Sequence, residues 1–179
     1  MKTKTNYKWL IKIILISVVA SMVFTIASAE ILGRAGYIVA FIVLAVFIVI
    51  GIIFDVIGVA VTVAAEAPFH SMAAHRERGA TESLKLIRNA DKVSSFCNDV
   101  VGDVTGIISG TIAALIAARL MEGLSTENFV FPLLISGVVT GLMVGGKAVG
   151  KTIAINGSTR IVHKVGKLIN SLKLKKNCK

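Results

Sequence analysis

Residues 145–152 read GGKAVGKT and match the phosphate-binding pattern G-x-x-x-x-G-K-[ST] at its fixed positions, Gly145, Gly150, Lys151 and Thr152. A working loop of this kind joins a buried strand to a helix, so that backbone N–H groups can bind phosphate. Here the match follows a long apolar run, and no alternation of strands and helices surrounds it. We therefore expect no nucleotide partner, and we expect that the chain is not an enzyme.

Oxygen-bearing side chains near the ends of the apolar runs offer a different chemistry. The four that we single out as metal ligands are Glu66, Asn98, Asp99 and Asp103. Carboxylate and amide oxygens are the ligands that hard cations prefer, and Mg²⁺ takes them in near-octahedral geometry with some water retained. Ionisable groups at membrane depth are costly and point to function. The sequence therefore predicts a site or pathway for a divalent cation, with Mg²⁺ as the first candidate.

A further carboxylate, that of Asp55, lies inside the second apolar run, eleven residues before Glu66. Eleven residues make about three helical turns, so one continuous helix would place both carboxylates on one face. Two structural roles compete with a cation site. Asp55 can pair with Lys147 or Lys151, and Asp99 can cap the third membrane helix, because acidic residues suit helix N-termini.

The elements that must position these groups are four apolar runs in a chain of 179 residues, of which 55% are hydrophobic and 17% are charged. The runs cover about residues 9–29, 36–65, 100–120 and 129–146. About 20 apolar residues are enough for one helix to cross a bilayer. We therefore expect an all-α, polytopic transmembrane protein, with three main membrane helices and one further helix before them.

Basic residues concentrate on one side of this four-pass arrangement. Of the 20 Lys and Arg residues, 18 lie in residues 2–12, 66–95 and 147–179, and the exceptions are Arg34 and Arg119. The positive-inside rule then places both termini and residues 66–95 in the cytoplasm, with the chain in the plasma membrane. Anchoring to anionic lipid accounts for the net charge of +10, so we expect a bilayer partner and no nucleic acid.

The N-terminal segment allows two interpretations. A basic start, an apolar stretch and the small residues ASA before Glu30 fit a cleavable signal peptide as well as an extra membrane helix. We therefore divide the chain into residues 1–30, a membrane domain over residues 31–154, and a basic juxtamembrane amphipathic helix with its tail over residues 155–179.

Two stretches outside the apolar runs have the pattern of helices that lie at a membrane surface. In residues 66–95 the apolar residues are spread among charges, and Gly79 divides the stretch into two short amphipathic helices. In residues 155–172 the apolar residues recur near helical spacing with basic residues between them. This second pattern predicts a further interfacial helix.

Glycine recurs at every fourth position in the last two apolar runs. The two glycine ladders are Gly102, Gly106 and Gly110, and Gly137, Gly141 and Gly145. Such spacing keeps the glycines on one helix face, where two backbones can approach closely. The first interpretation is packing of the two runs within one subunit, and the alternative is the interface of a homodimer.

Four short motifs carry a family resemblance: AEA at residues 65–67, GA at 79–80, CND at 97–99 and GKAVGKTIA at 146–154. They resemble the motifs of the membrane domain of the CorB/CorC and cyclin M (CNNM) proteins, which are linked to magnesium efflux. In that family the corresponding motifs are Ser-Glu-x-Ala, Gly-Ala, Gly-Asn-x-x-x-Asn and Gly-Glu-x-x-Pro-Lys-x-x-Ala. The resemblance covers about residues 36–172.

The chain is a divergent version of that pattern. Ala65 stands in place of the motif serine, Lys147 in place of the motif glutamate and Gly150 in place of the motif proline. We also expect it to lack the CBS domains that regulate many members of the family. The substitution at Lys147 matters most, because it reverses a charge next to the expected cation site.

The resemblance implies membrane transport or homeostasis of magnesium or another divalent cation, carried out by a homodimer. The residues that would supply oxygen ligands or line the pathway are Glu66, Asn98, Asp99 and Asp103. The alternative is a non-transporting membrane scaffold or regulatory subunit derived from the same family, which Ala65 and Lys147 favour. The direction in which Lys147 points distinguishes the two.

Overall fold

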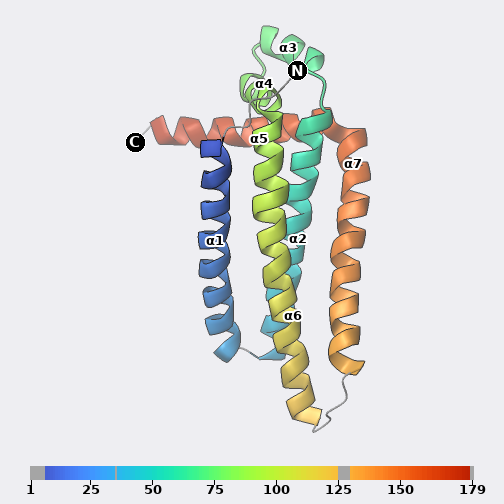
Figure 1. Cartoon of the computed structure of the whole chain (residues 1–179). Coiled ribbons are helices and arrows are strands. Elements are labelled where there is room, and N and C mark those ends of the chain that lie inside the picture. The colour runs from blue at the N-terminus through green and yellow to red at the C-terminus, as the bar shows by residue number, and fades with distance from the viewer. Residues whose placement is uncertain (1–6, 35, 125–129, 178–179) are drawn as a thin grey trace. The chain divides into compact units, whose positions relative to one another are not determined.

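The computed structural model describes residues 7–34, 36–124 and 130–177, and among them it contains helices and no strand. In chain order the elements are α1 (Tyr7–Arg34), α2 (Tyr37–Val63), α3 (Ala67–Ala74), α4 (Ala80–Arg88), α5 (Ala90–Ser95), the π-helical segment η1 (Phe96–Gly102), α6 (Asp103–Leu124) and α7 (Val130–Asn177), as Figure 1 shows. The expected all-α fold class is confirmed.

Three helical stretches are long and apolar enough to cross a membrane: Tyr37–Val63, Ala90–Glu122 and Val130–Lys173. The chain is therefore a polytopic helical membrane protein. In α1 the apolar stretch Ile11–Ala27 is shorter than the other three. Even so, α1 packs against α6, and its Phe24 ring meets the Phe47 ring of α2 edge-on, with the ring centroids 6.1 Å apart.

The chain forms two compact units. The first unit comprises Met1–Gly51 and Val100–Gly145, and the second comprises Ile52–Asp99 and Gly146–Lys179. Helices α2 and α7 each contribute residues to both units.

The core of the first unit is apolar and is centred on α6. Ile108, Ile112 and Ile116 are almost completely buried, and they pack with Leu44 of α2 and Val139 of α7. Their spacing of four residues places the three isoleucines on one face of α6. Figure 1 shows α1 running alongside α6 in this unit.

The core of the second unit joins the short helices to α7. Phe69 of α3 and Val162 of α7 are fully buried in one cluster. The buried Ser83 hydroxyl of α4 lies 2.9 Å from the Gly79 carbonyl oxygen and 3.2 Å from the Val162 carbonyl oxygen. Gly79 has a φ of 86°, a left-handed conformation that favours glycine, and it directly precedes α4. The expected break into two short helices at this residue is confirmed.

Helix α7 differs from the expectation at its C-terminal half. Residues 155–172 are helical and belong to the same helix as the last membrane run, while their expected place at the membrane surface stays a prediction. Figure 1 shows that α7 bends but remains continuous. The glycines at the end of the apolar run therefore do not end the helix.

Five of the six ladder glycines do not form the expected close backbone contact within the first unit. A Cβ added at Gly110, Gly137, Gly141 or Gly145 would meet no atom within 4 Å, and one at Gly106 would make an ordinary contact of 3.6 Å with the Met143 side chain. For Gly110, Gly137, Gly141 and Gly145 the interpretation as packing of the two runs within one subunit is wrong, whereas Gly106 lies in contact with the Met143 side chain of α7.

Candidate functional site

Glu66 lies outside α2. This helix ends at Val63, and Glu66 is the N-cap residue of α3. Pro68 stands in the first turn of α3, a position that suits proline, whereas the interior of a continuous helix does not. The expectation that Asp55 and Glu66 share one helix face is therefore wrong.

The Glu66 carboxylate is exposed and lies among basic groups. Its Oε2 is 3.3 Å from the His70 Nε2 and 3.6 Å from the Arg88 Nε. A cation at this carboxylate would have to replace both neighbours. Glu66 therefore belongs to a group of ion-paired side chains on the surface of the short helices.

Asn98 occupies a different environment, inside η1 and within the membrane-spanning stretch Ala90–Glu122. Its side-chain oxygen Oδ1 is buried, and no residue that the structure describes forms a hydrogen bond with it. The amide lies against Gly58 of α2, where an added Cβ would overlap it. Buried polar atoms are nearly always paired, and π-helical segments often occur at functional sites. Of the four expected ligands, Asn98 therefore has the strongest structural signal.

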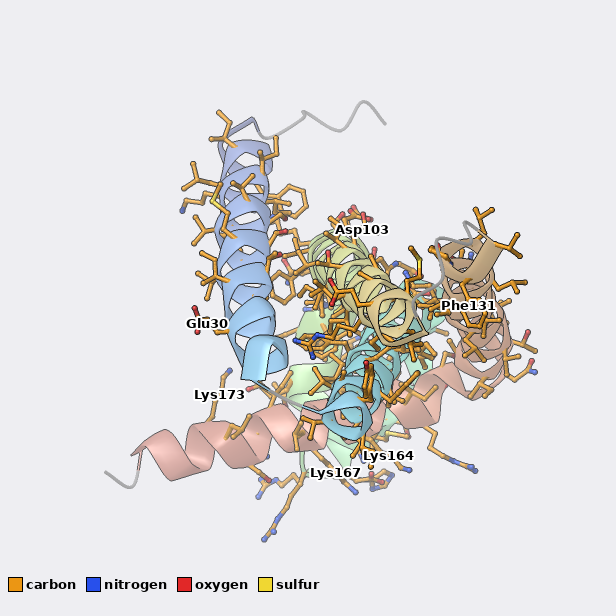
Figure 2. The ribbon with its side chains drawn as sticks, turned by 90° about the horizontal axis from the view of Figure 1, so that it is seen from below. Glu30, Asp103, Phe131, Lys164, Lys167 and Lys173 are labelled. Atoms are coloured by element: carbon orange, nitrogen blue, oxygen red, sulfur yellow. The ribbon has the colours of Figure 1, made fainter. Side chains whose placement is uncertain are left out.

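Asp99 and Asp103 are both exposed. Asp99 lies within η1, and the chain is already helical from Ala90, so Asp99 does not cap the start of a helix. Asp103 is the first residue of α6, and Figure 2 shows its side chain directed away from that helix. Within the described parts of the chain, no three or more His, Cys, Asp or Glu side chains form a group that could hold a metal ion.

An ion pair crosses from α2 to α7 inside the apolar region. The Lys147 Nζ lies 3.8 Å from the Asp55 Oδ1, and the two side chains are only 28% and 16% exposed. This is the structural pairing that the sequence left open for Asp55. Lys151, the other candidate partner, is exposed.

Asp55, Asn98 and Lys147 together form what we call the polar layer of the second unit. Gly58 follows Asp55 by three residues, so the two lie on the same side of α2, about one turn apart. The amide of Asn98 packs on Gly58, and the ammonium of Lys147 pairs with Asp55. The layer therefore combines one carboxylate, one unpaired amide oxygen and one cation at membrane depth.

Sequence reasoning named Glu66, Asn98, Asp99 and Asp103 as ligands and gave Asp55 an ion pair with Lys147 or Lys151 as its competing role. The contact between Asn98 and Gly58 was not anticipated. A signal for it was present, because a glycine within an apolar helix often marks a point where another group approaches closely. Gly58 is such a residue, one turn after the only acidic residue of α2.

The residues of the phosphate-binding pattern are all helical. Gly146 and Gly150 face α2, where an added Cβ would overlap the Ile52 and Val56 side chains. Backbone N–H groups inside a helix already donate to carbonyl oxygens of the preceding turn, so they cannot cradle a phosphate. Of the two glycines at fixed positions of the pattern, Gly150 packs against α2, whereas a Cβ added at Gly145 would meet no atom within 4 Å.

Comparisons with known protein families, with curated proteins and with solved structures found no match to this chain. The resemblance to the CorB/CorC and cyclin M proteins therefore remains an expectation carried by the four motifs. The polar layer and its surroundings are the features of the molecule that bear on its function.

Proposed function

We propose that this membrane protein binds and transports a divalent cation, with Mg²⁺ as the leading candidate, and that the polar layer is the binding site. The observation that carries the proposal is the buried Asn98 Oδ1, which has no hydrogen-bond partner in a membrane-spanning stretch. An unpaired carbonyl-type oxygen at this depth is costly unless a ligand satisfies it. Hard cations such as Mg²⁺ bind oxygen donors of this kind.

The second oxygen donor of the proposed site is the Asp55 carboxylate. Mg²⁺ binds through one or two carboxylates and retains several water molecules, so two protein ligands are sufficient for a transient site. In this proposal the Lys147 ammonium neutralises Asp55 when no cation is bound, and an incoming cation displaces it. Glu66 and Asp99 remain proposed contributors at the mouth of the pathway, and Asp103 a proposed contributor along it.

A second candidate function rests on the Lys147–Asp55 ion pair itself. Within the membrane, a lysine ammonium 3.8 Å from the carboxylate supplies the positive charge that a cation would otherwise supply. A chain in which this ion pair is permanent would be a scaffold or regulatory subunit that transports nothing. The family resemblance allows both outcomes, because Lys147 stands in place of the motif glutamate.

Calorimetric titration of purified protein with Mg²⁺ separates the two functions. If Lys147 competes with the cation, Lys147→Met should strengthen Mg²⁺ binding at least about tenfold, a change of about 1.4 kcal/mol. Lys151→Met is the matched control, because it removes the same charge one turn away at an exposed position. Asn98→Leu should abolish binding in either background. If none of these proteins binds Mg²⁺ at millimolar concentration, the scaffold function is the one that stands.

The orientation in the membrane is part of the same proposal. The distribution of basic residues supports cytoplasmic termini in the plasma membrane, with the bilayer as the surrounding partner. Cysteine labelling in intact cells tests this, with single cysteines placed at the exposed positions Glu30, His75 and Glu122. Labelling of position 75 from the outside together with position 30 or position 122 contradicts the orientation.

We further propose a homodimer that forms through the open glycine face of α7. Gly137, Gly141 and Gly145 line this face, and the first unit places no atom within 4 Å of a Cβ added there. Such a face lets a second helix approach closely. Chemical cross-linking in membranes tests the proposal: Gly141→Leu should reduce the cross-linked dimer, and an unchanged yield would exclude this face.

A further inference from the structure

A polar cavity of about 510 Å³ lies in the second unit, between α3 and the C-terminal half of α7. Its lining residues are Met72, Asn156, Gly157, Thr159, Arg160 and His163. Neither the polar layer nor the proposed transport uses this cavity.

The polar groups of the cavity come from one face of α7. Asn156, Thr159, Arg160 and His163 follow the spacing i, i+3, i+4 and i+7, which aligns side chains along one side of a helix. Together they present an amide, a hydroxyl, a guanidinium and an imidazole. Each of these groups can donate a hydrogen bond, and Gly157 leaves room beside them.

Arg160 and His163 each keep hydrogen-bonding capacity that a ligand could use. Among the residues that the structure describes, Arg160 makes no ion pair with a carboxylate. The His163 side chain is only 13% exposed, and its buried Nδ1 has no hydrogen-bond partner in the described part of the chain. The other ring nitrogen, Nε2, lies 3.6 Å from the Glu77 Oε2. A protonated ring would therefore hold Glu77 on one side and offer Nδ1–H to a ligand on the other.

We propose that this cavity binds a phosphate-bearing anion through Arg160 and His163, with Asn156 and Thr159 as further donors. An arginine guanidinium matches phosphate oxygens with two parallel hydrogen bonds, and a cavity of this size has room for a phosphate headgroup. Either the headgroup of an anionic phospholipid or a soluble phosphate can supply this chemistry. The Glu77 carboxylate lies beside the imidazole, and it opposes an anion less once it is paired with His163.

The neighbouring residues of α7 provide a matched control. Lys164 and Lys167 are exposed and carry the same charge as Arg160, but they do not line the cavity. Figure 2 shows both on one side of α7 and Lys173 on the other. A general attraction of anions to this basic helix would act through Lys164 as strongly as through Arg160.

The test uses the full chain in an uncharged, phosphate-free detergent and measures the thermal unfolding midpoint with two probes. The first probe is inorganic phosphate and the second is a short-chain phosphatidylglycerol. We expect one of them to raise the midpoint of the wild type and of Lys164→Gln. Arg160→Gln should weaken this response about tenfold or more, because it removes a charged hydrogen-bonding group. His163→Gln should weaken it as well.

The pattern of responses identifies the source of the anion. A response to both probes or to phosphate alone indicates a soluble phosphate, and a response to phosphatidylglycerol alone indicates a lipid headgroup. The proposal is overturned if neither probe shifts the wild-type midpoint. It is also overturned if Arg160→Gln and Lys164→Gln lower the response equally, because the effect would then come from net charge. Circular dichroism and gel filtration check that each variant is folded.

Discussion

Glycine has opposite roles in the two halves of α7. In the first unit Gly137, Gly141 and Gly145 form a regular ladder, yet an added Cβ would meet nothing within 4 Å. In the second unit an added Cβ at Gly150 or Gly166 would overlap a neighbouring element. Regular spacing therefore does not establish contact within the subunit. Contact depends on whether another element of the same unit crosses the helix at that residue.

The charged groups follow the same division. The core of the first unit is built from apolar residues of α2, α6 and α7. In the second unit, ion pairs join α2 to α7 through Asp55 and Lys147, and α4 to α7 through Glu82 and Lys173. The polar layer and the polar cavity also belong to the second unit. We therefore expect substitutions there to have the larger effects on stability and on function.

The largest expected effect is that of Gly166→Val. A Cβ at this residue would lie 2.6 Å from the Gly79 carbonyl oxygen and would also overlap the Ser83 hydroxyl. The Gly79 backbone cannot move far to relieve this overlap, because Gly79 directly precedes α4. Overpacking of this kind costs about 3 kcal/mol, and the unfolding midpoint in detergent should fall accordingly.

Gly141→Val is the control for this comparison, since it makes the same chemical change in the ladder; it is measured on monomeric protein in detergent, so that the proposed dimer contact does not contribute. Because no atom lies within 4 Å of the added Cβ, we expect a change in unfolding free energy within about 0.5 kcal/mol. Equal losses of stability in the two variants would contradict the contrast between the two halves of α7.

A smaller effect is expected from breaking the Asp55–Lys147 ion pair. Lys147→Met leaves the Asp55 carboxylate without its cation at membrane depth, and we expect a loss of about 2 kcal/mol when Mg²⁺ is chelated. Removing both charges, in Asp55→Leu with Lys147→Met, should recover most of this loss. The measurement is a double-mutant cycle of unfolding free energies. Additive effects of the two substitutions would show that the two charges do not interact.

The smallest effect concerns the pair between α4 and the end of α7. The Lys173 ammonium lies 3.0 Å from the Glu82 Oε2, and this hydrogen bond, with that from Lys85, holds the pKa of Glu82 below its ordinary value of 4.5 despite partial burial. A lowered pKa in the folded state means that the pair stabilises the protein above pH 4.5. That contribution is lost as the pH falls through the lower pKa of the folded state.

Hydrogen exchange of the last turns of α7 as a function of pH measures this contribution. We expect protection near Lys173 to fall below pH 4.5 in the wild type, by an amount equivalent to less than about 1 kcal/mol. In Glu82→Gln the same turns should be less protected at neutral pH and should lose this acid dependence. An identical pH profile in both proteins would show that the Glu82–Lys173 pair does not stabilise these turns.

The sequence predicted the elements better than their contacts. The apolar runs were sufficient to predict the membrane helices, and Gly79 was sufficient to predict the break before α4. Both features follow from local composition. Glu66 was assigned to the helix of Asp55, although Pro68 favours the start of a new helix there. The continuity of α7 could not be predicted from its sequence, since an interfacial helix has the same local pattern of apolar and basic residues.

The polar layer was predicted only in parts. Asn98 was identified as an oxygen ligand, and a pairing of Asp55 with Lys147 was one of the alternatives. The sequence could not show that Asn98 lies against Gly58, because these residues are distant in the chain and only the packing of η1 on α2 brings them together. The assignment of Glu66, Asp99 and Asp103 as metal ligands remains a prediction.

The most direct test of the central claim is a flux measurement with the full chain in liposomes that contain a Mg²⁺-sensitive dye. We predict that an inward Mg²⁺ gradient raises the dye signal with wild-type protein, and that Asn98→Leu abolishes this rise while Lys151→Met leaves it unchanged. A wild-type signal equal to that of protein-free liposomes, from protein shown to be folded and inserted, would contradict transport through the polar layer.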